Sequence, residues 1–320
     1  MDIPVLLLPL GVSFLLAVLL GPLAIPLLKR LKFGQQVRSD GPQTHLKKSG
    51  TPTMGGIIIL FAAAVSFLRY AEYTAEFWVL LIAMLGFGLV GFLDDYIKIA
   101  LKRSLGLTAR QKLLGQLLFG IIICIILYRA GHDTSIALPG TDLSLDLHLF
   151  YYPFIILMFM AVGNAVNFTD GVDGLLSGTS AIAFAAFAIV ALRAAEPEAA
   201  VFSAAMIGAV LGFLVYNAHP AKVFMGDSGS LGIGGGLAAV AILTKTELLF
   251  IVIGGIFVIE MLSVVLQVAS FKLRGKRIFR MSPIHHHFEV GGWSEWKVVT
   301  MFWAAGFLFA AAGLMLDGAV

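Results

Sequence analysis

Five aspartates in this 320-residue chain stand where long apolar runs end, and their positions suggest chemistry. Asp94 and Asp95 end one such run in the stretch GFLDDYIKIALKR, and Lys98 follows three to four positions later. On a continued helix these three side chains share a face. The stretch alone leaves two interpretations open: an ordinary ion pair at a helix end, or two repelling carboxylates that a bound cation would neutralise.

A second acidic stretch, GNAVNFTDGVDGLLSG, ends another apolar run. It places Asn167, Asp170 and Asp173 three positions apart, and Gly171 and Gly174 follow the two aspartates. Glycines allow a ligand to approach the backbone closely. Capping and turn formation before the next helix are the alternative explanation. The density of acceptors exceeds what a connecting loop needs, which favours a ligand site.

A third stretch, YNAHPAKVFMGDSGSLGIGGG, brings Asn217, Phe224 and Asp227 together with a run of small residues. Small residues at the start of a helix favour a nest of backbone N–H groups that binds an anion. The Gly-Lys-Ser/Thr ending of a P-loop is missing. Phe224 either stacks on a nucleobase or is an ordinary buried aromatic residue. The stretch suits a phosphate-containing ligand.

Two other stretches supply basic side chains. In THLKKSGTPTMGG, Lys48 and Thr53 flank a rigid turn, and Lys48 either meets a phosphate or is one of many basic residues on the cytoplasmic side. RMSPIHHHFEVGGW contains His285, His286 and His287. Three successive histidines do not share a helical face, so they suit a single zinc site poorly. Protonated imidazoles instead bind phosphate or orient another group.

Two ionisable residues, Glu260 and Cys124, lie inside apolar runs. Glu260 lies within an apolar run, where a carboxylate is usually paired or functional. The sequence names neither its partner nor its role. Cys124 is the single cysteine, which excludes a disulfide framework and a cysteine metal site.

Composition places all of these stretches in a membrane protein. Apolar residues make up 59% of the chain and charged residues 13%, and the mean hydropathy is +0.94. A spanning helix needs about 20 apolar residues. The continuous apolar runs predict an all-α polytopic protein rather than a closed barrel. We expect about ten transmembrane helices, at about 3–28, 53–71, 76–93, 112–130, 149–166, 176–194, 199–217, 230–245, 247–271 and 298–317.

Loop charges predict the orientation of these helices. Most of the 22 Lys and Arg residues fall in alternate loops, which we assign to the cytoplasm, so both termini face outward. The net charge of +3 follows from this asymmetry and calls for no nucleic-acid partner. The topology brings the five aspartates to one membrane face. We see no internal repeat and treat residues 1–320 as a single catalytic domain.

The stretches together favour a hard divalent cation that holds a pyrophosphate. Mg²⁺ prefers oxygen ligands, often one or two carboxylates plus substrate phosphates. Apolar grooves between helices would present a lipid phosphate at the same depth, which indicates a lipid phosphotransferase. A transporter that uses membrane carboxylates is the rival from another class, and it would place its acids near mid-membrane.

The motifs DDYIK, NAVNFTDGVDGL, FMGDSGSLGIGG, HLKKSGTPTMGG and SPIHHHFE closely resemble those of the phospho-N-acetylmuramoyl-pentapeptide-transferase family. This family belongs to the polyprenyl-phosphate N-acetylhexosamine-1-phosphate transferase superfamily, and the resemblance covers essentially the whole chain. Phe168 is a conservative departure, where the family commonly carries Leu. The resemblance implies Mg²⁺-dependent transfer of phospho-N-acetylmuramoyl-pentapeptide from its UDP carrier to undecaprenyl phosphate, which gives lipid I and UMP. It also implies a homodimer in the bacterial inner membrane.

The resemblance implies roles for individual residues as well. Asp227 is similar to the magnesium ligand, and Asp94 and Asp95 to the essential acidic pair, with Asp94 acting on the lipid phosphate either as a base or as a nucleophile. The active site is expected at the cytoplasmic loops 44–56, 94–112, 164–176, 217–230 and 272–297. The resemblance implies that the nucleotide site is formed by Lys48, Thr53, Asn167, Asp170, Asp173, Asn217 and Phe224. It implies that the phosphate and sugar-peptide region is lined by Lys98, His285, His286 and His287. Gln267 and Ser282 are expected to reach the peptide end of the substrate.

Overall fold

The computed structural model describes residues 3–31, 50–101 and 105–318, which are mostly helical. Lys48 and most of the stretch before Thr53 lie outside these residues. The helices are Ile3–Arg30 (α1), Gly56–Tyr70 (α2), Ala75–Ala100 (α3), Ala109–Ala130 (α4), Tyr151–Thr169 (α5), Leu175–Arg193 (α6), Pro197–Asn217 (α7), Gly226–Leu243 (α8), Phe250–Ile253 (α9), Gly255–Arg274 (α10), Ile284–Val290 (α11) and Glu295–Asp317 (α12).

The helices confirm an all-α polytopic membrane protein. Among the described residues, nine helices are long and apolar enough to span a membrane, and α2 is a shorter apolar helix. Each of the ten predicted apolar runs overlaps one of these helices. The ninth run is divided at Gly254 into α9 and α10. Large apolar side chains stay exposed on the helices, such as Leu19 and Leu23 on α1, as expected for surfaces that meet lipid tails.

Two helix boundaries differ from the prediction and change how the acids are held. We expected α3 to end before Asp94, but it continues to Ala100, so Asp94 and Asp95 lie on its last two turns. We expected α8 to begin near residue 230, but it begins at Gly226 and has Asp227 in its first turn. Hydropathy falls at a charged residue, whereas backbone hydrogen bonding continues through it. The carboxylates are therefore fixed on helices rather than on loops.

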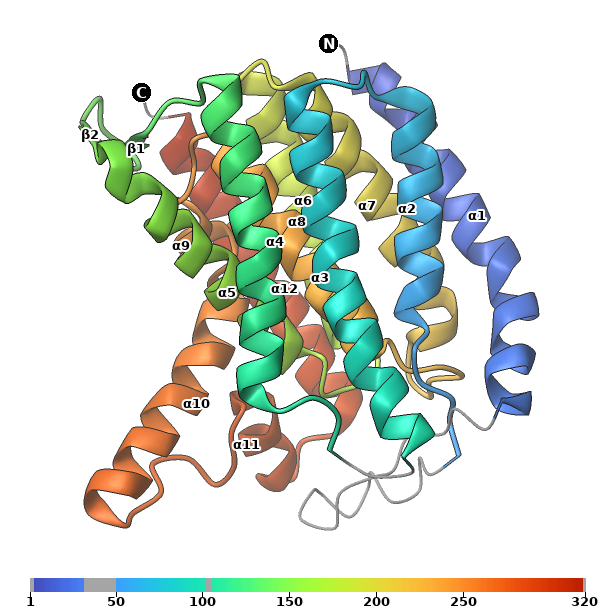
Figure 1. Cartoon of the computed structure of the whole chain (residues 1–320). Helices are drawn as coiled ribbons and strands as arrows, with labels where there is room; N and C mark the ends of the chain where they lie inside the picture. Colours follow the sequence, from blue (N-terminus) through green and yellow to red (C-terminus); the bar gives the residue numbers. More distant parts are fainter. Residues whose placement is uncertain (1–2, 32–49, 102–104, 319–320) are drawn as a thin grey trace.

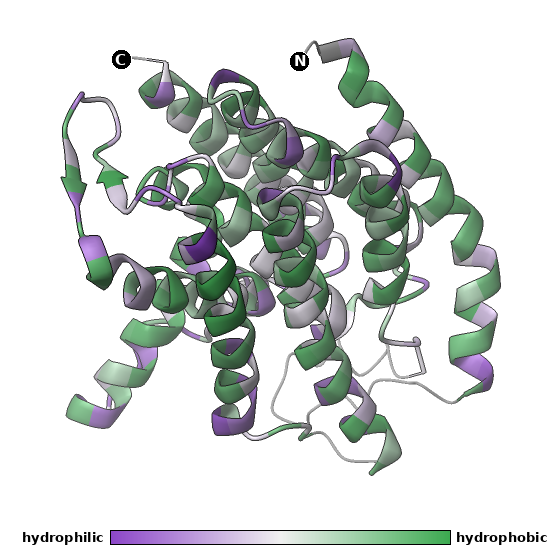
Figure 2. Ribbon diagram, turned by 45° about the horizontal axis from the view of Figure 1, so that its top comes forward, coloured by the Kyte–Doolittle hydropathy of each residue, from purple (hydrophilic) through white to green (hydrophobic). Residues whose placement is uncertain are grey.

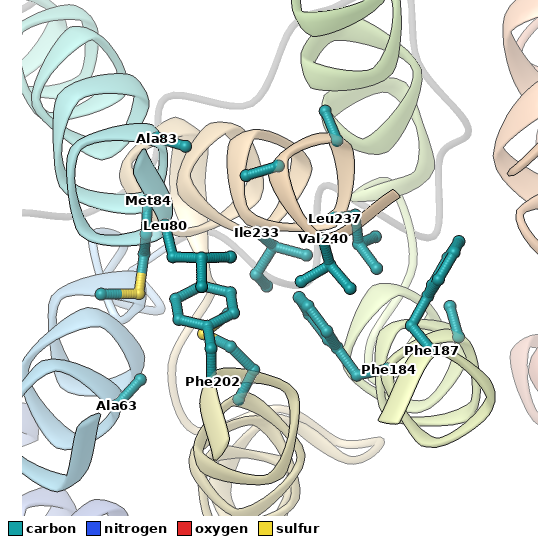
Figure 3. Close-up of a cluster of buried hydrophobic side chains, with 14 of the residues drawn as sticks. Ala63, Leu80, Ala83, Met84, Phe184, Phe187, Phe202, Ile233, Leu237 and Val240 are labelled. Carbon is teal, nitrogen blue, oxygen red and sulfur yellow. The ribbon is translucent and has the colours of Figure 1, made fainter. Parts of the chain in front are cut away.

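Helix α8 lies at the centre of the bundle, where every residue from Ser228 to Leu243 is buried. Figure 3 shows Ile233, Leu237 and Val240 of α8 among side chains from α2, α3, α6 and α7. Small residues let the helices approach closely. A Cβ atom on Gly91 of α3 would lie 2.0 Å from the Asp227 carbonyl oxygen of α8. This contact brings the acidic ends of the two helices together.

The two ends of the bundle differ in composition. Both termini lie at one end, together with the antiparallel hairpin of Ser135–Ala137 (β1) and Ser144–Asp146 (β2) (Figure 1). We call this the terminal end. The opposite end carries Asp94, Asp95, Asp170, Asp173 and Asp227, and we call it the acidic end. Figure 2 shows that the middle parts of the helices are mainly hydrophobic, with hydrophilic residues gathered towards their ends and in the loops.

Candidate functional site

Three carboxylates meet where α3 packs against α8. One oxygen from each of Asp94, Asp95 and Asp227 lies within 4.8 Å of the others. Gly226 makes room for this approach: it has a positive φ of 76°, and a Cβ atom there would lie 2.6 Å from Asp95 Oδ2. The same Asp95 oxygen accepts a hydrogen bond from the Ser228 backbone N–H at 3.0 Å. The start of α8 therefore fixes the α3 carboxylate.

Two lysines face these carboxylates. Lys98 Nζ lies 2.5 Å from Asp94 Oδ2 and 2.9 Å from Asp227 Oδ2. Lys112 Nζ lies 2.6 Å from Asp227 Oδ2 and 3.6 Å from Asp94 Oδ2. Sequence reasoning missed Lys112 because it stands at the start of an apolar run, where a basic residue is ordinary. Its partners belong to other helices, which the sequence pattern does not reveal.

The three carboxylates are suited to a hard metal ion. Their ligand atoms are all oxygens, which Mg²⁺ and Ca²⁺ prefer. Asp94 and Asp95 are buried, and buried charges need a counter-charge. The two lysines supply part of this charge and leave the cluster one negative charge in excess when all five groups are ionised. The site can therefore hold a metal ion and a phosphate group together.

Asn167 and Asp170 extend the cluster towards α5. Asn167 Nδ2 donates to Asp227 Oδ1 at 2.9 Å and to Ser230 Oγ at 2.8 Å. Asp170 caps the C-terminal end of α5. Burial, together with the negative charge of Asp227, raises the pKa of Asp170 from 3.8 to about 8. The structure thus brings both predicted residues beside the three carboxylates.

A second cluster forms around Asp173. Its Oδ2 accepts a hydrogen bond from the Ala221 backbone N–H and lies 3.0 Å from His219 Nδ1. His219 Nδ1 also lies 3.1 Å from Glu295 Oε2 at the start of α12. Ligand atoms of these three titratable residues lie within 4.8 Å of one another, so this group also has a geometry that can hold a metal ion.

Asn217 binds the chain itself. Its Oδ1 accepts from the Gly174 backbone N–H at 3.1 Å and from Ser177 Oγ at 3.0 Å, and its Nδ2 donates to the Val223 carbonyl at 3.1 Å. These bonds join the start of α6 to the loop before α8. Asn217 therefore stabilises the end of the turn that carries Asp170 and Asp173. A direct contact of Asn217 with a ligand stays a prediction.

Backbone hydrogen bonds connect Phe224 to Pro52 and Gly55, the residues on either side of the segment that contains Thr53. The Phe224 N–H donates to the Pro52 carbonyl at 2.8 Å, and the Gly55 N–H donates to the Phe224 carbonyl at 2.9 Å. Thr53 is buried and its Oγ1 lies beside Gly226. The ring of Phe224 is half-buried. The stretch before α2 is thus attached to the loop that precedes α8.

The three histidines have three different partners, which agrees with their expected lack of a common helical face. His285 is buried against Glu260, with Nδ1 3.0 Å from Oε1. His286 Nδ1 lies 2.6 Å from Glu289 Oε2. His287 Nδ1 accepts a hydrogen bond from the Arg280 backbone N–H at 3.1 Å. His285 turns towards the Asp170–Asp173 loop, because a Cβ atom on Gly171 would lie 2.1 Å from its Nε2.

Gln267 and Ser282 occupy the segment that joins α10 to α11. Gln267 Oε1 accepts from the backbone N–H groups of Ile278 and Phe279, and its Nε2 donates to the Phe279 carbonyl. The amide therefore holds this segment against α10. Ser282 is half-buried just before α11. A contact of either residue with the peptide end of a substrate stays a prediction.

Comparisons with known proteins agree with the resemblance. A profile of Glycosyl transferase family 4 matches residues 77–245, and signature 1 of phospho-N-acetylmuramoyl-pentapeptide-transferase matches residues 48–60. The transferase of that name from Bacillus subtilis (strain 168) is 57% identical over 311 residues, which is 95% of each chain. That from Bacillus pumilus (strain SAFR-032) is 56% identical over 309 residues, again 95% of each chain.

A third relative extends the match. The phospho-N-acetylmuramoyl-pentapeptide-transferase from Geobacillus sp. (strain WCH70) is 55% identical over 317 residues, which is 98% of each chain. The predicted resemblance is therefore confirmed over nearly the full length. This chain belongs to the phospho-N-acetylmuramoyl-pentapeptide-transferase family and is a glycosyl-1-phosphate transferase.

Proposed function

We propose that this enzyme transfers phospho-N-acetylmuramoyl-pentapeptide from UDP-N-acetylmuramoyl-pentapeptide to undecaprenyl phosphate, which gives lipid I and UMP. The observation that carries the proposal is the meeting of Asp94, Asp95 and Asp227 with two lysines at the acidic end. Such a site suits two phosphate-containing substrates, because its lysines bind phosphate and its carboxylates bind a divalent cation.

Mg²⁺ is the proposed cofactor, held by Asp227 with the α3 carboxylates nearby. When bound, it would neutralise the charge that develops as the bond between the sugar-linked phosphorus and the bridging oxygen of the diphosphate breaks. Lys98 and Lys112 would bind phosphate oxygens. Asp94 faces both lysines and is placed to accept a proton from the lipid phosphate. Phosphoryl transfer depends mainly on such positioning and charge neutralisation.

Two routes are consistent with this geometry. In the direct route, a lipid phosphate oxygen attacks the sugar-linked phosphorus and UMP leaves with the bridging oxygen. In the covalent route, an Asp94 oxygen attacks the sugar-linked phosphorus first and UMP leaves, and a lipid phosphate oxygen then displaces the Asp94 carboxylate from the phospho-sugar intermediate. We favour the direct route because a phosphate is already an adequate nucleophile. Exchange of labelled UMP into the UDP substrate, with lipid phosphate rigorously absent, would overturn the direct route.

The remaining site residues are proposed to bind the rest of the UDP substrate. We assign Lys48, Thr53, Asp170, Asp173 and Phe224 to the nucleotide. Asn167 and Asn217 shape this part of the site through the hydrogen bonds described above. The triple histidine segment, Gln267 and Ser282 are assigned to the sugar and peptide region.

The cellular setting is part of the same proposal. The loop charges support an inner-membrane enzyme whose acidic end faces the cytoplasm, where the soluble UDP substrate is available. Membrane lipid would surround the exposed apolar helices. A homodimer is proposed from the family resemblance alone.

The substrate assignment has a direct test. Purified enzyme is supplied with undecaprenyl phosphate, Mg²⁺ and either UDP-N-acetylmuramoyl-pentapeptide or UDP-N-acetylglucosamine, and UMP release is measured. We expect release from the first sugar nucleotide only. No release from the muramoyl-pentapeptide substrate would overturn the proposal, and release from UDP-N-acetylglucosamine alone would assign the enzyme to another branch of the superfamily.

A further inference from the structure

Glu260 of α10 and His285 of α11 form a buried pair at the acidic end. Both side chains are fully buried, and His285 Nδ1 lies 3.0 Å from Glu260 Oε1. The second polar atom of each residue, Glu260 Oε2 and His285 Nε2, is buried and has no hydrogen-bond partner among the described residues. A buried polar atom without a partner costs about 1–3 kcal/mol. The pair therefore holds hydrogen-bonding capacity that the fold does not use.

The unpartnered nitrogen, His285 Nε2, points towards the turn between Asp170 and Asp173. A Cβ atom on Gly171 would lie 2.1 Å from His285 Nε2, so the imidazole fills the space that a side chain would occupy there. Gly171 stands directly between Asp170 and Val172, two residues before Asp173. A glycine at this position lets the ring reach the backbone of the turn. His285 Nε2 thus lies beneath the segment assigned to the nucleotide.

Charge balance indicates which atom of the ring carries hydrogen. A buried ionised carboxylate beside a neutral imidazole would leave one uncompensated negative charge, which is expensive in a low-dielectric interior. Two arrangements avoid this charge: imidazolium with carboxylate, or neutral imidazole that accepts a proton at Nδ1 from a protonated Glu260. The two arrangements differ only in the position of one proton between Oε1 and Nδ1. In both of them Nε2 carries hydrogen and is a donor.

We propose that Glu260 is a positioning residue that acts through His285: it fixes the imidazole under Gly171 and keeps hydrogen on Nε2, which donates to an oxygen of the bound UDP-linked substrate. The inference rests on the proposed function and deepens it. The acceptor is a phosphate or sugar oxygen, because these are the acceptor-rich groups that would cover the Asp170–Asp173 turn. A partner supplied only by the substrate explains why Nε2 has none in the chain alone.

A purely structural role explains the pair less well. Replacing a buried ion pair by apolar residues of similar volume is often neutral or stabilising. Glu247 at the terminal end also has an unpartnered oxygen, so what distinguishes the Glu260–His285 pair is the position of His285 Nε2 against Gly171, in the turn between Asp170 and Asp173. The unsatisfied Nε2 at the substrate turn favours a role in binding.

Steady-state kinetics of Glu260→Gln, His285→Gln and the double variant test the proposal in the full-length enzyme. A neutral amide at position 260 can either donate to Nδ1 or accept from it, so it does not keep hydrogen on Nε2. We therefore expect kcat/KM for the UDP substrate to fall roughly 10- to 100-fold in each single variant. KM for undecaprenyl phosphate should stay unchanged. The double variant should be no worse than His285→Gln, because Glu260 acts only through that ring.

Glu247→Gln is the matched control, because Glu247 is also a buried glutamate with an unpartnered Oε2 but lies at the terminal end. It should leave both KM values unchanged. Losses that add in the double variant, or equal rises in both KM values, would assign Glu260 to general packing and overturn the inference. Absence of UMP release by the wild-type enzyme would instead overturn the proposed function.

Nitrogen NMR of wild-type enzyme labelled with ¹⁵N-histidine supplies a measurement that needs no active variant. The signals of the seven histidines are compared with those of His285→Gln, or of His285→Asn if the first variant does not fold, to identify His285. We expect its Nε2 to resonate as a nitrogen that carries hydrogen at neutral pH. A hydrogen-free Nε2 would overturn the proposal.

Discussion

The acidic end and the terminal end both bury carboxylates, but they compensate the charge differently. At the terminal end, Glu247 Oε1 accepts a hydrogen bond from the Tyr151 hydroxyl at 2.5 Å and lies 3.4 Å from Lys245 Nζ. Lys245 also donates to the Asp133 carbonyl and to the Tyr151 hydroxyl, and His132 lies beside that hydroxyl. One acid thus meets one base and one neutral donor. Burial raises the pKa of Glu247 above its ordinary value.

At the acidic end, the carboxylates outnumber the cations that contact them. Asp94, Asp95 and Asp227 share Lys98 and Lys112, and Asp170 adds a fourth acid nearby. Groups arranged in this way cost stability and are typical of functional sites. Buried charge alone therefore does not identify a functional site. The balanced cluster connects helices, whereas the unbalanced cluster at the acidic end has oxygen ligands and excess negative charge that could hold a metal ion.

Asp227→Asn should have the largest effect on activity. The change removes a carboxylate that contacts both lysines and is the proposed metal ligand. We expect UMP release to fall by about 10³-fold or more, because transition-state charge stabilisation of several kcal/mol is lost. The unfolding midpoint should change little, because the apolar core around α8 is untouched. Retained activity would remove Asp227 from the metal site.

Lys112→Met should come next. Asp227 and Asp94 would then share Lys98 alone. We expect turnover to fall by about 10- to 100-fold, which corresponds to the free energy of one hydrogen bond to a charged group. The Mg²⁺ concentration for half-maximal activity should fall as well, because a competing positive charge has gone. Arg110→Met is the control, since Arg110 is exposed on the same turn of α4. Equal losses in both variants would indicate damage to α4 rather than to the site.

The sequence predicts much of the acidic end for a physical reason. Apolar runs of membrane length locate the helices, and the charge pattern of the loops then brings Asp94, Asp170 and Asp227 to one end. The same pattern does not predict which side chains from different helices contact one another. Lys112 and Glu260 each contact a residue that is far along the chain, so their roles depend on helix packing.

The hydropathy pattern also did not predict where the helices near the site begin and end. A hydropathy window stops where charges begin, but α3 and α8 extend into the charged region because neighbouring groups stabilise their polar turns. The Ser228 N–H and the two lysines provide this compensation for Asp95 and Asp227. The division of the ninth apolar run at Gly254, and the short helix α11, likewise come from tertiary packing.

Tyr151→Phe tests the terminal end, where we expect an effect on stability alone. The phenyl ring keeps the packing but leaves Glu247 without the hydroxyl donor. The loss of a hydrogen bond to a buried charged group should lower the free energy of unfolding by about 1.5–3 kcal/mol. The kcat/KM for UMP release should stay within about twofold, because Tyr151 lies at the end away from the carboxylates. A large loss of kcat/KM with an unchanged free energy of unfolding would contradict the expectation that the terminal end contributes to stability and the acidic end to catalysis.

Asp170→Asn should have the smallest effect on stability, visible as a change in its pH dependence. The pKa of Asp170 is raised by burial and by Asp227, from 3.8 to about 8 in the folded chain. The folded state therefore holds a proton that the unfolded state has released between these values, so stability is lost as the pH rises through this range. Without divalent cations, the wild-type unfolding midpoint should fall between about pH 5 and about pH 8, and Asp170→Asn should show a shallower fall.

Asp142→Asn is the control for this measurement, because Asp142 is an exposed aspartate at the terminal end. It should keep the wild-type slope. Added Mg²⁺ should flatten the wild-type curve, since a nearby cation favours the ionised carboxylate and lowers its pKa. An identical slope in Asp170→Asn and wild type would show that Asp170 is ionised in the folded enzyme without a metal. The excess acid at this end would then be compensated by the chain itself, as it is for Glu247.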